Sequence, residues 1–236
     1  MESRCLDISH VLLTHWHGDH TGGVPDLIAY RPEYTSRIYK NRPDRGQNPI
    51  NDGEIFETEG ATVKAVFTPG HAVDHMCFVL EEENALFTGD NVLGHGYSVV
   101  EDLGTYMKSL LYMEEQQCPV GYPAHGARIE NLPLKIKQYI RHKTMREKQV
   151  YSTLVASDGR LVKGSWKNKR SLTTRELVHS LHGEVSDQTF EMALEPFMAQ
   201  VLWKLAEDGK VGFERVGSNR RWFAHRHVLE VGPLKH

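Results

Sequence analysis

Cysteine is scarce in this chain, with only Cys5, Cys77 and Cys118 among its 236 residues. Three scattered thiols cannot build a disulfide framework, and their spacing does not match a zinc finger. This scarcity fits a reducing compartment, so we expect a cytoplasmic protein. Cys77 lies inside the apolar run 76–80 and is expected to be a small buried hydrophobic side chain.

Long hydrophobic runs and a strong charge bias are also missing. No apolar stretch approaches the roughly 20 residues that a membrane-spanning helix needs, so a membrane role is not expected. The formal net charge of −3 gives no overall signature of binding to polyanions. With 39% hydrophobic and 25% charged residues, the chain is typical of a globular protein of one large or two small domains.

Histidine, by contrast, is plentiful and clustered. The segment 14–20, Thr-His-Trp-His-Gly-Asp-His, follows an apolar run at 11–13 that is typical of a strand. Side chains alternate along a strand, so His15 and His17 can point the same way as the chain leaves the sheet. Asp19 and His20 follow where the chain must turn toward a short helix at about 24–30. Two pairs of ligands that point in two directions suit two neighbouring metal ions.

Three further segments end an apolar run with turn-forming residues and one ligand-type side chain. These side chains are His71 after the run 63–67, Asp90 after 85–88, and His125 in the turn 123–126. A single histidine is more often structural than a ligand. Histidine and aspartate clustered in this way usually indicate a metal site.

Two more histidines lie near these segments. His75 follows His71 by four residues and either supports the site or caps the next strand, and we favour support. His95 lies in a glycine-rich loop after Asp90, close enough to approach a reacting group, but we do not expect it to be a ligand.

The order HxHxDH, TPGH, TGD and Pro-x-His-Gly resembles the metallo-β-lactamase superfamily. The resemblance implies an α/β fold, an αββα sandwich with its site along one edge of two sheets. It also implies that one metal is held by His15, His17 and His71, the second by Asp19, His20 and His125, with Asp90 bridging them. Ligands without thiolate suit zinc and also admit manganese or iron, and we expect two Zn²⁺ ions.

These ligands predict hydrolysis. Divalent cations lower the pKa of water from 15.7 to about 7, which supplies a hydroxide for attack on a carbonyl or phosphoryl group and stabilises the oxyanion. Asp19 is also expected to be catalytic, because its second carboxylate oxygen could accept and pass on a proton during turnover.

The beginning of the chain departs from the superfamily pattern. Several strands precede the HxHxDH motif in that superfamily, whereas only 14 residues precede His15 here. The resemblance therefore implies that the N-terminal strands are largely missing. We expect an unpaired sheet edge and an uncovered apolar face, and hence a poorly soluble or inactive chain as written.

The pattern after the first motif predicts a catalytic domain over residues 1–155. Strands are expected at 38–39, 55–56 and 61–67, with a hairpin formed by 76–80 and 85–88. Helical periodicity follows at 101–113, with acids in the first turn, and at about 134–154. The second helix is strongly basic, which indicates an acidic partner or substrate; it carries Lys135, Lys137, Arg141, Lys143, Arg146 and Lys148 against Glu147.

The sequence after residue 155 predicts a linker or insertion at 156–170 and a small domain at 171–236. Thr173 followed by Glu176 is typical of a capping box at the start of a helix. One long helix or two short ones should cover 190–208, before a hairpin of 211–216 with 221–224. Helix, helix, hairpin is the layout of a winged helix, which we expect here to pack or dimerise rather than to read DNA.

Further segments resemble the lactamase-beta-2-like branch of the superfamily, including 106–110, 136–147 and 205–211. That branch contains animal single-strand endoribonucleases and fungal thioesterases that act beside polyketide synthases. The segments 14–24 and 34–40 are most similar to the fungal group. The resemblance implies hydrolysis of an acyl carrier protein thioester that releases an aromatic polyketide, with single-strand endoribonuclease as the alternative. Nucleic acid would be a partner only under that alternative, and a catalytically silent scaffold is disfavoured by the complete ligand set.

Overall fold

The structure, a computed structural model, describes residues 7–158 and 171–225. Its contacts divide the chain into two compact units, residues 1–141 and 142–236, and each is described by itself. Helix α4 (Leu132–Asp158) runs through the boundary between them. The predicted domain limits at 155 and 171 stay a prediction, and most of the predicted linker, 159–170, lies outside the described residues.

The first unit contains two sheets. A small parallel sheet joins β1 (Val11–Leu12), β2 (Ile38–Lys40) and β3 (Asn48–Pro49). The larger sheet has the order β4 (Ile55–Thr58), β5 (Ala61–Phe67), β6 (Met76–Leu80), β7 (Ala85–Gly89) and β8 (Val120–Pro123). It is antiparallel except for the parallel pair β7 and β8. The predicted hairpin of β6 and β7 is confirmed, with Phe78 opposite Phe87.

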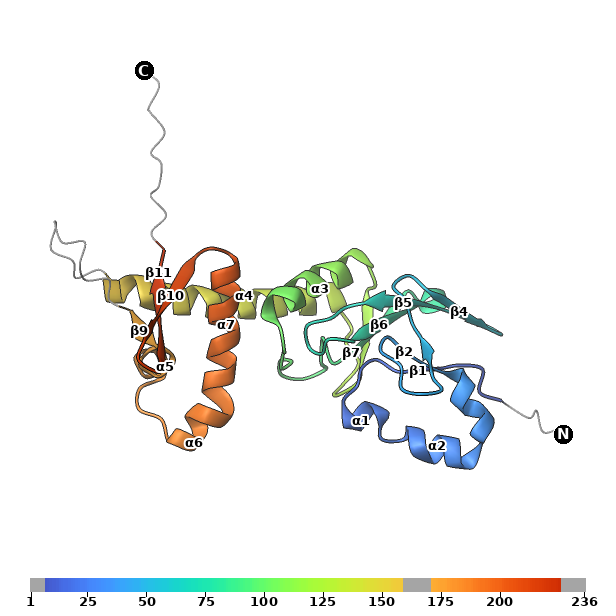
Figure 1. The fold of residues 1–236 in the computed structure, drawn as a ribbon. Helices are drawn as coiled ribbons and strands as arrows, with labels where there is room; N and C mark the ends of the chain where they lie inside the picture. Colours follow the sequence, from blue (N-terminus) through green and yellow to red (C-terminus); the bar gives the residue numbers. More distant parts are fainter. Residues whose placement is uncertain (1–6, 159–170, 226–236) are drawn as a thin grey trace, which may run out of the picture. The chain divides into compact units, whose positions relative to one another are not determined.

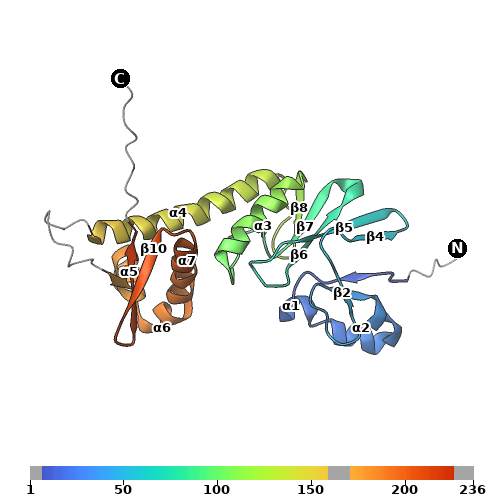
Figure 2. The same ribbon diagram turned by 45° about the horizontal axis from the view of Figure 1, so that its top comes forward.

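The sheets pack as the middle layers of the first unit. Leu12 of β1 and Tyr39 of β2 contact a buried cluster that includes Phe56, Met76 and Phe78 of the larger sheet. Outside the small sheet lie α1 (Gly18–Thr21), α2 (Val24–Tyr30) and the 3₁₀ segment Pro32–Arg37, while α3 (Leu103–Glu115) lies on the far side of the larger sheet (Figures 1 and 2). The predicted αββα sandwich is confirmed, and the small sheet covers the larger one at the cluster.

Helix α3 begins later than the sequence predicted. The acids at 101–102 precede its first turn, and Asp102 is the N-cap, whose carboxylate accepts a hydrogen bond of 2.6 Å from the backbone N–H of Thr105. Capping satisfies one of the free N–H groups at a helix start. The spacing of Tyr106, Leu110 and Met113 then turns three fully buried side chains toward the core.

Helix α4 is less basic at its surface than its composition indicated. Lys137, Arg141 and Lys148 are exposed, but Lys143 is buried and therefore adds nothing to a basic face. Burial lowers the pKa of Lys143 to about 8. No helix within the described residues has both the length and the apolar composition to cross a membrane.

The second unit combines short helices with a small sheet. After the part of α4 that it contains come β9 (Leu172–Thr173), α5 (Thr174–His182), α6 (Asp187–Thr189), a π-helical turn (Phe190–Leu194) and α7 (Glu195–Glu207). The predicted hairpin forms as β10 (Val211–Val216) and β11 (Asn219–Ala224), and the capping box of Thr173 and Glu176 is present. The identification of this unit as a winged helix stays a prediction.

Candidate metal centre

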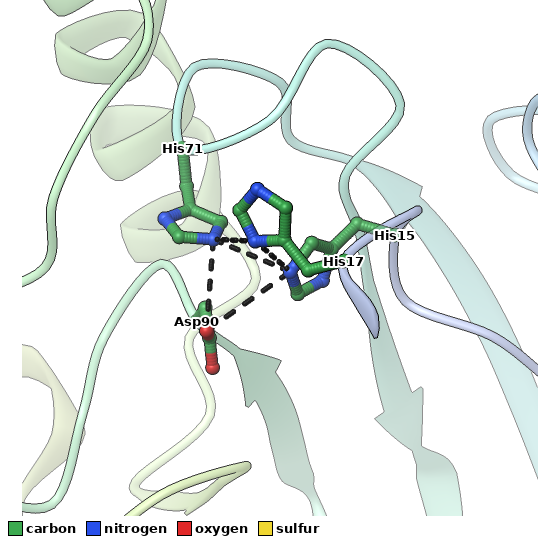
Figure 3. A group of neighbouring side chains, drawn as sticks. All are labelled: His15, His17, His71 and Asp90. Carbon is green, nitrogen blue, oxygen red and sulfur yellow. Dashed lines mark hydrogen bonds and ion pairs between the residues drawn. The ribbon is translucent and has the colours of Figure 1, made fainter. Parts of the chain in front are cut away.

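The first group of candidate ligands brings three imidazoles and one carboxylate together from three loops. His15 and His17 follow β1, His71 follows β5, and Asp90 follows β7 (Figure 3). Nε2 of His15 lies 2.9 Å from Nδ1 of His17 and 3.3 Å from Nε2 of His71. An oxygen of Asp90 lies 3.6 Å from Nε2 of His71. Segments that are 75 residues apart in the chain, at His15 and Asp90, therefore meet where β1 of the small sheet and β7 of the larger sheet end.

The second group shares Asp90 with the first and adds Asp19, His20 and His125. Asp19 and His20 are in the first turn after His17, and His125 follows β8. Nε2 of His125 lies 3.1 Å from an oxygen of Asp19, and Nε2 of His20 lies 3.4 Å from an oxygen of Asp90. The structure thus brings together all seven predicted ligands and places Asp90 between the two groups.

The hydrogen bonds around the first group leave lone pairs facing one another. The carbonyl oxygen of Val99 can only accept, so Nδ1 of His71, 2.7 Å away, carries the proton and Nε2 does not. Nδ1 of His15 lies 3.0 Å from the hydroxyl of Thr14, and in the tautomer in which Nδ1 donates to that oxygen its Nε2 is free as well. Two unprotonated nitrogens 3.3 Å apart repel each other unless a cation lies between them. This donor set therefore fits a divalent metal ion.

Two buried atoms without a hydrogen-bond partner indicate that the second group also fits a divalent metal ion. Nε2 of His20 and Oδ1 of Asp90 are buried and have no hydrogen-bond partner among the described residues. Leaving a buried polar atom unpaired costs about 1–3 kcal/mol, so a missing partner is expected at both. A divalent cation would satisfy both atoms at once.

Thr14 holds one histidine of each group. Its hydroxyl oxygen lies 3.0 Å from Nδ1 of His15 and 3.3 Å from Nδ1 of His20. Because an oxygen can accept two hydrogen bonds, one side chain can orient both rings so that their Nε2 atoms face inward. The sequence analysis did not identify this role, since a threonine before the motif resembles any other strand residue.

His75 supports Asp90 rather than joining either group. The backbone N–H of Asp90 donates to Nε2 of His75 at 3.0 Å, and Nδ1 of His75 lies 3.0 Å from the hydroxyl of Thr68. A ring that accepts at Nε2 must be neutral. Its complete burial lowers its pKa well below the ordinary value, in agreement with that state. The prediction that His75 supports the site is borne out by these contacts.

Two glycines allow the loops that carry His71 and Asp90 to pack closely against neighbouring residues. Gly70, immediately before His71, has φ +130°, and a Cβ there would lie 2.4 Å from the backbone of Tyr106. Gly89, immediately before Asp90, has φ +51°, and a Cβ there would lie 2.5 Å from Nε2 of His75. The glycines in TPGH and TGD are therefore steric requirements of the site.

The protonation states of His15, His71 and Asp90 favour metal binding at neutral pH. Burial and the neighbouring histidines lower the pKa of His15 to about 3, and burial also lowers the pKa of His71. Burial alone would raise the pKa of Asp90, but the nearby imidazole of His20, whose Nε2 lies 3.4 Å from the carboxylate, outweighs this and lowers it to about 2. Neutral His15 and His71 beside an ionised Asp90 are the protonation states that a metal ion requires, whereas Asp90 raises the pKa of His20, so a metal ion would compete with a proton at that ring.

The two groups differ in their access to solvent. The side chain of His15 is 0% exposed, whereas those of Asp19 and His125 are 60% and 43% exposed. The second group therefore lies at the open side of the centre. A substrate can therefore reach the centre past Asp19 and His125.

Three exposed apolar residues are adjacent to the first group in the chain or through a hydrogen bond, and we call them the apolar rim: Trp16, Val73 and Val99. Trp16 separates His15 from His17 and is 51% exposed. Val99 supplies the carbonyl that holds His71. An exposed apolar side chain next to a polar site favours contact with an apolar ligand, and the ring centre of Trp16 lies 4.6 Å from that of His17.

Asp74 is a further residue that the sequence analysis missed. It is buried, and one of its oxygens accepts the backbone N–H of Trp16 at 3.3 Å, which fixes the loop between His15 and His17. The sequence does not reveal this role of Asp74, because the contact joins residues that are 58 positions apart. His95, in contrast, is exposed and belongs to neither group, as expected.

Comparison with known proteins agrees with this geometry. The profile of the "Metallo-beta-lactamase superfamily" matches residues 28–125. Lactamase-like protein adaB of Aspergillus niger is 64% identical over 234 residues, which cover 99% of this chain and 72% of that protein. Lactamase-like protein aptB of Emericella nidulans is 60% identical over 224 residues, with 94% of this chain and 71% of that protein covered.

Solved structures show the same fold. A beta-lactamase domain protein from Burkholderia ambifaria has a TM-score of 0.75 at 17% identity, covering 95% of this chain and 76% of that one. A metallo-beta-lactamase family protein from Thermus thermophilus has a TM-score of 0.60 at 24% identity, covering 92% and 72%. With its His and Asp cluster, its sandwich and these relatives, the chain belongs to the metallo-β-lactamase superfamily of hydrolases.

Proposed function

We propose that this hydrolase cleaves the thioester between an aromatic polyketide and the acyl carrier protein of a polyketide synthase, and that it uses two Zn²⁺ ions. The observation that carries the proposal is the apolar rim beside the two groups of ligands. An aromatic acyl chain can pack on Trp16 while its carbonyl faces the centre. The likeness of the motifs to fungal thioesterases supports the same substrate class.

The contacts of the candidate ligands give no support for a phosphate backbone as the substrate. Within the described residues, the ion pairs formed by the seven side chains involve only histidine and aspartate, with no lysine or arginine. Proteins that bind single-stranded nucleic acid line the path of the backbone with positive charge. Endoribonuclease activity therefore becomes an outcome of the test and not a second proposal.

The ligand set determines the chemistry. When bound, the two cations supply a hydroxide near neutral pH and stabilise the oxyanion that forms on the carbonyl. His15, His17 and His71 would hold one ion, and Asp19, His20 and His125 the other, with Asp90 shared. A thiolate leaves without much need for a proton, so no separate general acid is required.

Asp19 is the candidate proton acceptor. Its side chain is more exposed than those of His15, His20, His71, Asp90 and His125. Interactions with its own backbone N–H, His20 and His125 outweigh burial and lower its pKa, so the carboxylate is ionised at neutral pH. It can therefore accept a proton at the open side of the centre and release it to solvent.

Two exposed cations of the first unit provide a surface for the carrier protein. Lys137 and Arg141 lie one turn apart on α4 and are both exposed, although Lys137 also lies 3.5 Å from Glu114. An acidic carrier protein would be attracted to this face, and salt would weaken that attraction. We place this encounter in the cytoplasm, where the buried free thiols of Cys77 and Cys118 would stay reduced.

The test offers two substrates, an acyl-loaded carrier protein and a single-stranded RNA, to one preparation of the protein. We expect release of the polyketide acid from an acyl-loaded carrier protein, loss of this activity with a chelator, and its return with Zn²⁺. Asp90→Ala should abolish both metal loading and hydrolysis, whereas Glu59→Ala, an exposed acid outside the site, should leave both unchanged. Cleavage of single-stranded RNA without thioester turnover would replace the proposal by the endoribonuclease.

A further inference from the structure

The second unit contains a cavity far along the chain from the metal ligands. It has a volume of about 500 Å³, within the range of small-molecule sites. Its walls come from the start of α5, the π-helical turn, α7 and the end of the β10–β11 hairpin. All of these elements belong to residues 173–222, so the cavity is complete within this unit.

Arg220 in the wall of this cavity is a cation with no anion beside it in the part of the chain that the structure describes. Its guanidinium lies 4.6 Å from the ring centre of Trp203, 4.7 Å from Phe213 and 5.7 Å from Trp222. Its Nε is buried and has no hydrogen-bond partner, and no carboxylate pairs with it among the described residues. The next residue, Arg221, differs in this respect, because its guanidinium forms an ion pair with the carboxylate of Glu176 at 3.0 Å.

The geometry of Arg220 favours a carboxylate as the missing partner. Its aromatic neighbours hold the planar guanidinium in place, so its donors are already oriented when a ligand arrives. A planar fork of N–H groups matches the two oxygens of a carboxylate. Binding would also remove the cost of the unpaired buried Nε.

The rest of the wall favours an aromatic ligand with a single negative charge. Trp222 and Phe190 are buried, and Trp203 is partly exposed, so flat apolar faces line the cavity. Arg175 stacks on Phe190 at 4.1 Å, but its charge is already balanced by Asp187 at 2.7 Å. The exposed carboxylate of Glu195 in the wall adds a negative charge that disfavours polyanions such as nucleic acid.

We propose that this cavity is a binding site for a planar aromatic monocarboxylate, with Arg220 as the anchor of the carboxylate and Trp203 and Trp222 as the surfaces on which the ring packs. The site shares no residue with the metal centre, and the inference does not depend on the substrate of the hydrolase.

The test uses 2-naphthoate as the probe and the metal-loaded full chain. Quenching of tryptophan fluorescence and calorimetry should show saturable binding, and 2-naphthamide, which lacks the charge, should bind at least about tenfold more weakly. Arg220→Gln should weaken binding of 2-naphthoate by a similar factor. Arg45→Gln is the matched control, because Arg45 is an exposed arginine of the first unit and is not part of the cavity wall.

A second variant covers the case in which Arg220→Gln disturbs folding. Ala199→Leu places added volume in the cavity wall and leaves Arg220 in place, so it should also weaken 2-naphthoate binding while the thermal unfolding midpoint stays near that of the wild type. Binding that persists in both variants would assign the probe to the metal centre and overturn the proposal. A single-stranded oligonucleotide that displaces the probe, or no saturable binding at all, would overturn it as well.

Discussion

At the scale of single residues, the hydroxyl of Thr14 links the two halves of the candidate metal centre. It orients His15, a member of the first group, and His20, a member of the second. Contacts of this kind hold a ring in the orientation and protonation state that a metal ligand needs. A residue that binds no metal itself can therefore control the loading of two sites.

Replacing Thr14 by valine tests this link. Thr14→Val keeps the shape of the side chain but removes the acceptor for both Nδ1–H groups, so metal affinity should fall by about 10- to 100-fold. Competition with a chromophoric chelator measures the change. Thr14→Ser keeps the hydroxyl and should retain affinity close to that of the wild type, and equal affinities for the valine and serine variants would contradict this role.

Single residues also show where sequence reasoning reached its limit. His15, His17, Asp19 and His20 could be recognised as a set because they are close in the chain and close in space. Thr14 could not be given its role, because the role depends on the positions of two rings. Asp74 likewise acts through the backbone of a loop 58 residues earlier.

At the scale of elements, the ends of β5, β7 and β8 deliver His71, Asp90 and His125 to one edge. These three strands run in the same direction, because β6 is antiparallel to both β5 and β7 and β8 is parallel to β7. Their ends therefore lie at the same edge of the sheet and bring together ligands from loops that are far apart in the sequence. Helix α3 restricts this edge, because its backbone at Tyr106 contacts the loop before His71.

The contact between Gly70 and α3 gives a stability prediction. Gly70→Ala would place a Cβ 2.4–2.6 Å from atoms of Tyr106 at a positive φ, so the free energy of unfolding should fall by about 3 kcal/mol. Denaturant unfolding measures the loss. Gly60→Ala is the matched control, since Gly60 also has a positive φ but nothing lies within 4 Å of its Cβ position. The control should lose only about 1–2 kcal/mol, and equal losses would show that sterics at α3 do not matter.

Elements were predictable to different degrees. The β6–β7 hairpin, α2 and the capping box at Thr173 were predicted from local patterns and are confirmed. The start of α3 was predicted too early, because an acid before a helix and an acid in its first turn look alike in sequence. Helix α4 looked uniformly basic, but tertiary packing buries Lys143.

At the scale of the whole molecule, the buried neutral histidines make stability depend on pH. The pKa of His15 falls from 6.5 to about 3 on folding, and the pKa values of His71 and His75 are also lowered, chiefly by burial. The unfolded chain therefore binds more protons than the folded one between about pH 3 and pH 6.5. Stability rises with pH wherever the unfolded state binds more protons.

Acidification should therefore destabilise the metal-free protein. The thermal unfolding midpoint is expected to fall as the pH is lowered from 7 toward 5, roughly across the range in which free histidine gains its proton. The metal-loaded protein should lose more over the same range, because protons compete with the metal for the same nitrogens. Calorimetry at a series of pH values checks both slopes, and a flat or rising midpoint on acidification of the metal-free protein would contradict the buried neutral state.

The sequence by itself determined the family, the order of the ligands and most of the strands around them, because these features are written in short motifs and local periodicity. Only the tertiary structure decided that the seven side chains meet in two groups around Asp90, that Thr14 and His75 hold them, and that Arg220 has no anion beside it among the described residues. The physical reason is that hydrogen bonds, burial and charge balance depend on distance in space, which a linear pattern does not contain.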